Sequence, residues 1–202
     1  AHPAATRPMS YFVTGATGFI GRHLVRRLAA RGETIHVLGR AGSLPRLEAL
    51  REWWGEAARQ VIAVEGDLEQ PMLGVAPATL AALRGQVTHL FHLGAVYDLA
   101  APASRMEAAN VLGTGHVLDF AAEVAAGHLH LVSSIAAAGL YDGVFDETMF
   151  EQATGLEHPY FRTKHDSEAM VRSRCRVPWR VYRPAMVVGD SASGYIDKID
   201  GP

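Results

Sequence analysis

A glycine-rich segment at residues 14–21 lies between a short apolar run and a helical pattern, and it restricts the fold more than any other part of the chain. Its glycines follow the spacing G-x-x-G-x-x-G. Gly15 would permit a tight turn, Gly18 would let backbone approach a pyrophosphate, and Gly21 would let the helix pack closely on the strand. A glycine triplet alone fits an ordinary turn equally well. The strand–turn–helix context favours nucleotide binding, because the free N–H groups of a helix N-terminus attract phosphate.

Apolar runs and helical patterns alternate along the rest of the chain. The runs that we expect to be strands are continuous, and they lie at 11–13, 34–38, 61–64, 89–93, 129–132 and 179–182. The helical patterns between them lie at 19–30, 43–54, 77–84, 104–126 and 159–174. Continuous apolar strands that alternate with helices are typical of a parallel sheet buried on both faces. The pattern therefore predicts a doubly wound α/β domain, a three-layer αβα Rossmann fold.

One domain of ordinary size accounts for the 202 residues. We expect it to span residues 9–202. Residues 1–8 hold two prolines and no periodicity, so we expect a disordered lead or an expression remnant there. The formal net charge of -2 gives no basic patch for nucleic acid or for an anionic membrane.

Other composition features narrow the class further. Cys175 is the only cysteine, so an intrachain disulfide and a cysteine-built zinc site are excluded. The histidines show no spacing typical of a metal site. No apolar run approaches the length of a membrane span. A reducing cytoplasm is the expected compartment.

The end of the second expected strand discriminates between NAD and NADP. An NAD site usually places Asp or Glu there, where it accepts hydrogen bonds from the ribose hydroxyls. This sequence has Leu38-Gly39-Arg40, and a guanidinium suits a 2′-phosphate by charge and by geometry. Arg22, just after the last glycine, is a candidate second clamp. The sequence thus favours NADP(H), with a solvated loop residue as the alternative interpretation of Arg40.

Further cofactor contacts are expected at the ends of the third and fourth strands. Asp67 could accept a hydrogen bond from the adenine amino group, or it could cap the next segment. Gly94 and Ala95 are small enough for the backbone to pass beneath a cofactor. His92 fits a core position as well as a functional one.

Tyr160 and Lys164 lie four residues apart at the start of a predicted helix, which places them on one face, a turn apart. A free tyrosine titrates near pH ~10, so it needs a nearby cation for acid–base chemistry at neutral pH. Lys164 supplies that charge and can also bond the nicotinamide ribose. Tyr160 could then donate a proton as hydride reaches the substrate carbon.

A pair of serines, Ser133 and Ser134, ends the fifth expected strand. A hydroxyl at the carboxyl end of a strand in this fold faces the cofactor crevice and can polarise a substrate carbonyl. The Tyr-x-x-x-Lys pattern is weak by itself. The order of glycine turn, strand-end serine and Tyr-x-x-x-Lys is a strong indication.

These motifs resemble the extended short-chain dehydrogenases/reductases, in segments that cover nearly everything from residue 9 onward: 14–21, 66–68, 110–114, 133–134, 160–164 and 182–184. In the family pattern the catalytic serine lies five residues before the glycine that closes its loop, which indicates Ser134 rather than Ser133. The resemblance also implies a role for Asn110, otherwise read as a polar residue on a solvated helix face, and for Pro184 beside the nicotinamide. The expected catalytic residues are Ser134, Tyr160, Lys164 and Asn110. The expected cofactor-binding residues are Thr14, Gly15, Thr17, Gly18, Phe19, Ile20, Gly21, Arg22, Arg40, Asp67, Leu68, Gly94, Ala95, Tyr160, Lys164 and Pro184.

A finer resemblance is to fatty acyl-CoA reductases and thioester reductase domains, in segments 89–98, 132–139, 158–165 and 183–189. It implies hydride transfer from NADPH to a fatty acyl thioester, expulsion of the thiol, and an aldehyde or alcohol product. Family members continue beyond the sixth strand into a region that shapes the substrate pocket. Because this chain stops at Pro202, we expect that region to be missing from it. The sequence does not identify the length of the acyl chain, or whether the thiol is coenzyme A or a carrier protein. It also leaves the oligomeric state open, with a homodimer among the options.

Three other functions compete with this prediction. A sugar-nucleotide epimerase or dehydratase shares the fold and the Tyr–Lys pair, although such enzymes usually hold NAD through an acid where this chain has Arg40. A hydroxysteroid-type dehydrogenase has the same catalytic residues. A nucleotide-binding module without chemistry is the remote alternative, since such proteins commonly lose Tyr or Lys.

Overall fold

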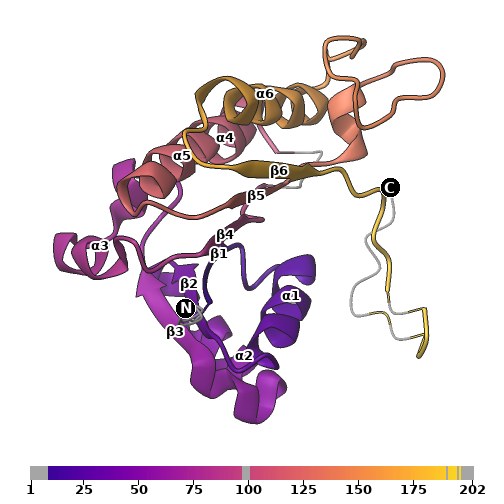
Figure 1. Cartoon of the computed structure of the whole chain (residues 1–202). Helices are drawn as coiled ribbons and strands as arrows, with labels where there is room; N and C mark the ends of the chain where they lie inside the picture. Colours follow the sequence, from indigo (N-terminus) through magenta and orange to yellow (C-terminus); the bar gives the residue numbers. More distant parts are fainter. Residues whose placement is uncertain (1–8, 97–100, 190, 195, 197–202) are drawn as a thin grey trace, which may run out of the picture.

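The computed structural model describes residues 9–96, 101–189, 191–194 and 196 (Figure 1). Six parallel strands form one sheet in the order β3-β2-β1-β4-β5-β6. The strands are β1 (Ser10–Thr14), β2 (Thr34–Gly39), β3 (Val61–Glu65), β4 (His89–His92), β5 (Leu129–Val132) and β6 (Trp179–Tyr182). The predicted doubly wound α/β fold is confirmed. The expected lead at 1–8, part of the compared segments 89–98 and the chain end at Pro202 lie outside the described residues.

The helices agree with the predicted ones except in one place. They are α1 (Phe19–Ala29), α2 (Leu44–Trp54), α3 (Pro77–Leu83), α4 (Ala103–Met106), α5 (Gly113–Glu123) and α6 (Pro159–Arg174). An unbroken helical stretch does occupy 103–123, as predicted, but a π-helical turn, η4 (Glu107–Leu112), divides it into α4 and α5. Such turns depend on tertiary contacts and are frequent at functional sites. Among the described residues, no helix combines the length and apolar character that crossing a membrane requires.

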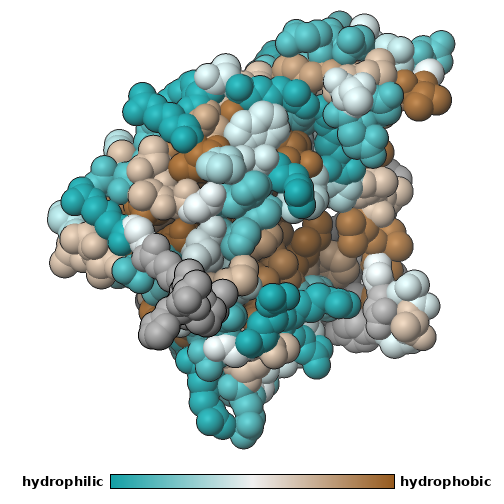
Figure 2. Space-filling view, in the orientation of Figure 1, coloured by the Kyte–Doolittle hydropathy of each residue, from teal (hydrophilic) through white to brown (hydrophobic). Residues whose placement is uncertain are grey.

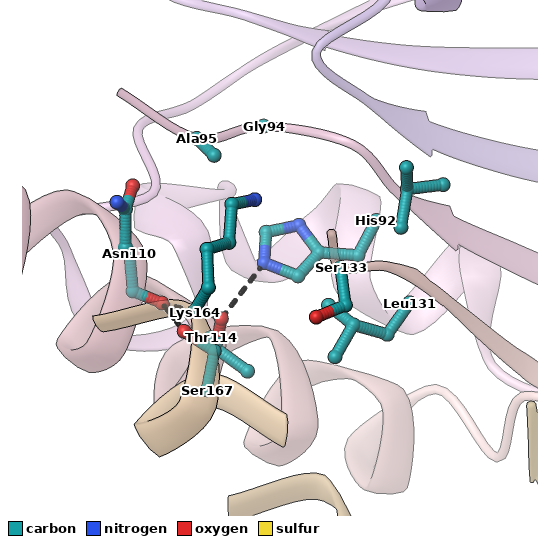
Figure 3. Close-up of a pocket in the computed structure, with 10 residues that line it drawn as sticks. His92, Gly94, Ala95, Asn110, Thr114, Leu131, Ser133, Lys164 and Ser167 are labelled. Carbon is teal, nitrogen blue, oxygen red and sulfur yellow. Dashed lines mark hydrogen bonds between the residues drawn. The ribbon is translucent and has the colours of Figure 1, made fainter. Parts of the chain in front are cut away.

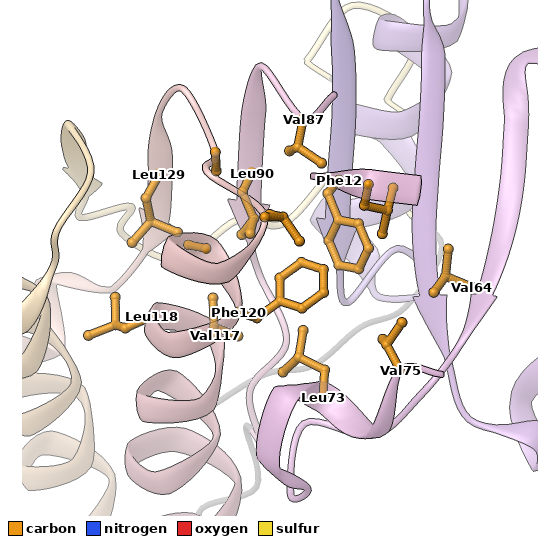
Figure 4. Packing of buried hydrophobic residues seen from close by; sticks show 14 of the residues in the cluster. Phe12, Val64, Leu73, Val75, Val87, Leu90, Val117, Leu118, Phe120 and Leu129 are labelled. Atoms are coloured by element: carbon orange, nitrogen blue, oxygen red, sulfur yellow. The ribbon is translucent and has the colours of Figure 1, made fainter. Parts of the chain in front are cut away.

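Alternate residues of β1 point to opposite faces of the sheet, which produces the three layers. Phe12 packs against Phe120 of α5, with ring centroids 4.6 Å apart (Figure 4). Tyr11 and Val13 belong to a second cluster that includes Val25 of α1. Two buried clusters therefore flank one sheet, and each rests on apolar side chains worth roughly 1.5–3 kcal/mol when fully buried.

The strand order reverses between β1 and β4. From β1 the chain proceeds outward to β2 and β3, and β4 returns to the other side of β1 before β5 and β6 continue away from it. In an open parallel sheet, ligands bind beyond the carboxyl ends of the strands at such a reversal. The glycine-rich turn follows β1 at this point, so the fold places it where a ligand is expected.

Candidate functional site

A groove of about 280 Å³ lies at the strand-order reversal, between the glycine turn and the ends of β2, β3 and β4. Many expected cofactor residues line it: Gly15, Thr17, Gly18, Arg40, Asp67, Leu68, Gly94 and Ala95. Side chains that the sequence did not single out also line it, among them Ser43, Glu69, Arg105 and Ala109. The expected cofactor-binding motifs thus converge on one concave surface.

The glycine turn has the shape needed to hold a phosphate. Gly15 has φ +72°, and a Cβ there would stand 2.6 Å from the amide nitrogen of Gly94. A Cβ on Gly21 would overlap the carbonyl of Gly15. Gly18 is the N-cap of α1 and has no side chain to cap it, and the first turn of the helix holds no acid. The N–H groups at this helix end can therefore donate hydrogen bonds to a pyrophosphate, so these residues fit the dinucleotide.

The two arginines expected to hold a 2′-phosphate are placed differently. Arg40 is exposed and lines the groove, and its carbonyl accepts a 2.8 Å hydrogen bond from the Ser43 hydroxyl. Arg22 is absent from the groove lining, and its guanidinium lies 5.3 Å from the ring centroid of Phe19 and 6.0 Å from that of Trp53. The structure therefore brings Arg40, but not Arg22, to the groove.

Helix α6, which carries the expected catalytic residues Tyr160 and Lys164, begins where the sequence predicted. His158 caps it, because its Nδ1 accepts a 3.1 Å hydrogen bond from the amide of Tyr160. Tyr160 and Lys164 are each 8% exposed, one turn apart. Burial lowers the pKa of Lys164 from its usual 10.5 to about 8, because the protein replaces the water around the ammonium.

A second, enclosed space of about 10 Å³ lies beneath the end of β4 (Figure 3). Its lining joins Lys164 and Asn110 to Gly94 and Ala95, which also line the groove. Ser133 lines this space as well, whereas Tyr160 and Ser134 do not. Lys164 is therefore held directly beside the strand end that the cofactor is expected to cross.

Asn110 is buried, at 2% exposure, so the alternative of a solvated helix face is wrong. Its Oδ1 accepts a 2.7 Å hydrogen bond from the amide of Val96, and its Nδ2 donates to the carbonyl of Val96 at 3.2 Å. The same Nδ2 donates to the hydroxyl of Thr163 on α6 at 3.3 Å. Asn110 thus ties the segment after β4 to α6.

His92 is the centre of a buried chain of hydrogen bonds. Its Nδ1 lies 2.7 Å from Thr14 Oγ1. Its Nε2 lies 3.1 Å from Thr114 Oγ1 (Figure 3). Thr114 donates its hydroxyl hydrogen to the carbonyl of Asn110 at 2.6 Å, so it must accept from His92. Thr14 accepts from the amide of Gly94 at 3.1 Å and can then donate to Nδ1.

The donors and acceptors of these hydrogen bonds require His92 to be a neutral imidazole that carries its proton on Nε2. Burial, helped by the nearby charge of Lys164, lowers the pKa of His92 to about 3, which agrees with that state. These hydrogen bonds join the end of β1, with its glycine turn, to the helix that carries Asn110. His92 is thus a buried polar link between the two halves of the site.

Ser134 lies in the loop after β5, and its hydroxyl oxygen accepts a 3.1 Å hydrogen bond from the amide of Ala136. The next residue, Ile135, donates its amide to the carbonyl of Pro184 at 3.1 Å. Pro184, expected on the nicotinamide side, therefore lies beside the serine loop (residues 133–139), although the two are far apart in sequence.

Sequence reasoning missed an ion pair below this loop. Glu168 of α6 is fully buried and binds Arg183, Arg172 and the hydroxyl of Ser133. Glu168 follows Lys164 by four residues. The spacing that places Tyr160 and Lys164 on one helix face therefore also places Glu168 on it, and could have identified it from the sequence. Within the part of the chain that the structure describes, no group of His, Cys, Asp and Glu side chains has the arrangement of a metal site.

Hydrophobic residues gather in a hollow on the face that Figure 2 shows, while polar residues cover most of the rest. Large apolar side chains are exposed in the segments that follow β5 and β6: Ile135, Met186, Val187 and Val188. Ile135 directly follows Ser134. Apolar surface is thus available next to the expected catalytic serine.

Comparisons with known proteins show the family of the chain. Residues 13–202 match the family model of NAD-binding proteins described as male sterility protein. The chain is 35% identical to a linear gramicidin synthase of Brevibacillus parabrevis, over 93% of this chain and 4% of that protein. It is 31% identical to the L-2-aminoadipate reductase of Penicillium chrysogenum, over 94% of this chain and 15% of the large subunit of that enzyme.

Two solved structures show the same fold. The terminal R domain from the myxalamid PKS-NRPS biosynthetic pathway superposes with a TM-score of 0.76 and 29% identity, over 94% of this chain and 51% of that chain. A UDP-galactose 4-epimerase superposes with a TM-score of 0.69 and 24% identity, over 90% of this chain and 57% of that chain, a likeness of fold alone. The chain therefore spans about half the length of these solved chains.

Proposed function

The chain belongs to the NAD-binding male sterility protein family of extended short-chain dehydrogenases/reductases, and on that premise we propose that it reduces acyl thioesters with NADPH. The observation that carries the proposal is the position of Lys164. It lies one turn from Tyr160 on a buried helix face and lines the same strand end, Gly94 and Ala95, as the nucleotide groove. The cation that would assist Tyr160 as proton donor thereby lies next to the proposed dinucleotide site.

The residues of the chain can carry out each protein-dependent part of the reaction. NADPH, when bound, would supply a hydride to the carbonyl carbon of the thioester. Tyr160 donates its hydroxyl proton to the carbonyl oxygen, while the Lys164 ammonium stabilises the resulting phenolate. The hydroxyl of Ser134 bonds the same oxygen and stabilises the negative charge that develops there. The tetrahedral hemithioacetal then collapses, the C–S bond breaks, and the thiol leaves with a proton to give an aldehyde.

NADPH rather than NADH is proposed because of Arg40. The end of β2 offers no acid to the ribose hydroxyls, whereas Arg40 is exposed and lines the groove. A guanidinium can form two charge-assisted hydrogen bonds to a 2′-phosphate.

We propose a fatty acyl thioester as substrate, supported by the exposed apolar side chains beside Ser134. The relatives named above include a gramicidin synthase and an aminoadipate reductase. The proposal covers a thioester of coenzyme A and one held on a carrier protein alike. The single cysteine, Cys175, agrees with a reducing compartment such as the cytoplasm.

The experiment follows the absorbance of reduced nicotinamide in the natural full-length protein. Palmitoyl-CoA and a carrier-bound palmitoyl thioester are offered with NADPH and, separately, with NADH. The expected result is thioester-dependent oxidation of NADPH that Tyr160→Phe abolishes and Tyr141→Phe, the loss of a loop hydroxyl, preserves. Tight NADPH binding without turnover of either thioester would contradict the reductase proposal, and equal rates with NADH would contradict the cofactor proposal.

A further inference from the structure

We propose that Glu168 is a positioning residue that sets Ser134 against the substrate carbonyl, acting through Ser133 and Arg183. The inference rests on the proposed function, because it assigns a residue to the same reaction. Glu168 does not line the groove or the enclosed space, so its effect must pass through its neighbours.

The carboxylate of Glu168 is completely buried and is shared among three donor side chains. Its Oε2 accepts from Arg183 Nε at 3.1 Å and from the Ser133 hydroxyl at 3.3 Å. Its Oε1 accepts from Arg172 Nη2 at 3.0 Å and also binds Arg183 Nη2. A single group thus joins α6, the end of β5 and the end of β6.

The residues on either side of Ser134 are both tied to this group. Before it, Ser133 donates its hydroxyl to Glu168. After it, the amide of Ile135 donates to the carbonyl of Pro184, the residue next to Arg183. Ser134 is therefore held from both sides by contacts that converge on one ion pair.

The hydroxyl of Ser134 is left with the orientation that the reaction needs. Its oxygen accepts from the amide of Ala136, so its hydrogen is directed away from that amide and can be donated to a substrate oxygen. Because Tyr160, Lys164 and Glu168 follow one another at four-residue intervals, they share a face of α6. The helix that presents the proton donor therefore also fixes the position of the serine.

Arg183 extends the same anchor to the loop between β5 and α6. Its Nη2 donates to the carbonyl of Met149 at 2.9 Å, and its Nη1 donates to that of Asp146 at 3.2 Å. Replacing a buried ion pair with packed apolar groups is often neutral or stabilising, so stability alone gives little reason for such a pair. A positional role explains why the donors all come from segments that border the serine loop.

The test is a double-mutant cycle on the rate constant for reduction, in the natural full-length protein. Glu168→Gln and Ser133→Ala are each made in the wild type and in a Ser134→Ala background. A displacement of about 1 Å near the reacting atoms costs roughly 100-fold, so Glu168→Gln should lower kcat by up to that factor and leave the Kd for NADPH unchanged. In the Ser134→Ala background it should cause no further loss, because residues that act as a unit are not additive.

Asp119→Asn is the matched control. It removes the ion-pair partner of Arg174, which also lies on α6 but away from the serine loop. It should leave kcat unchanged in both backgrounds. An equal loss from Glu168→Gln with and without Ser134 would overturn the inference. If Glu168→Gln fails to fold, Ser133→Ala decides by the same cycle, because it removes the contact without leaving a buried charge unpaired.

A measurement without turnover separates this inference from the proposed function. Amide hydrogen exchange at residues 133–139 should be faster in Ser133→Ala and Glu168→Gln than in the wild type, with the glycine turn at 15–21 unchanged. Unchanged exchange at 133–139 would overturn the inference even in an active enzyme. Failure of the proposed function would instead appear in the wild type, as an absence of thioester turnover.

Discussion

The backbone of Gly15 lies against that of Gly94, so close that a Cβ on Gly15 would stand 2.6 Å from the Gly94 amide nitrogen. Gly15 also has a positive φ of +72°, which an L-residue adopts only with strain. Gly15→Ala should therefore lower the free energy of unfolding by roughly 1–3 kcal/mol, and should weaken NADPH binding by moving the turn. Urea unfolding and a fluorescence titration measure both. The control is Gly42→Ala, where a Cβ meets nothing within 4 Å; equal effects of the two variants would contradict the prediction.

Arg40 should discriminate between the two nicotinamide cofactors. A charge-assisted hydrogen bond contributes about 1.5–3 kcal/mol, so Arg40→Ala should weaken NADPH binding by on the order of 30-fold. NADH binding should be unchanged, because NADH lacks the 2′-phosphate. Isothermal titration with each cofactor checks the prediction, with Arg46→Ala, an exposed arginine outside the groove, as control. Equal loss for both cofactors would assign Arg40 to another part of the nucleotide.

Lys164 should make the cofactor-free protein more stable in alkali. Burial lowers its pKa from 10.5 to about 8 in the folded state, so the unfolded chain binds the proton more tightly. The free energy of unfolding should therefore rise as pH increases from about 8 to 10.5, and this gain is lost as pH falls back through the folded pKa. Its full size is on the order of 3 kcal/mol. Lys164→Met should lack the rise, so parallel curves for variant and wild type would contradict the prediction.

His92 should have the corresponding effect in acid. Burial lowers its pKa from 6.5 to about 3, so the stability that its neutral form provides is fully present above pH 6.5 and is lost as pH falls toward 3. His92→Gln cannot titrate there and should show a shallower loss in urea unfolding between those values. His116→Gln, at a histidine that is only partly buried, is the control. A variant curve as steep as the wild type would mean that other groups account for the acid sensitivity.

Local patterns in the sequence predicted the layers of the fold and the outline of the site. The strand–helix alternation predicted the sheet, and the spacings within 14–21 and 160–164 placed the glycine turn and the Tyr–Lys pair. These features depend on neighbours within two turns of chain, so spacing alone reveals them.

Contacts between distant segments were not predictable in the same way. Thr14 and His92 are 78 residues apart, and Glu168 and Arg183 are 15 apart on different elements. Only the assembled sheet brings such pairs together. The π-helical turn at Asn110 has the same origin, since Asn110 bonds Val96 and Thr163 on two other segments. Arg22 was predicted from the sequence to bind phosphate, but its guanidinium lies against the nearby rings of Phe19 and Trp53.

The burial of Lys164 has a practical consequence for labelling. The sequence holds seventeen arginines but only two lysines, Lys164 and Lys198. An amine with a pKa of about 8 is partly unprotonated, and hence nucleophilic, in mildly alkaline buffer. Reductive methylation with isotope-enriched formaldehyde would therefore mark the site with a single NMR-visible methylated amine in the described part of the chain. Its chemical shift would report cofactor arrival directly, with no substrate present.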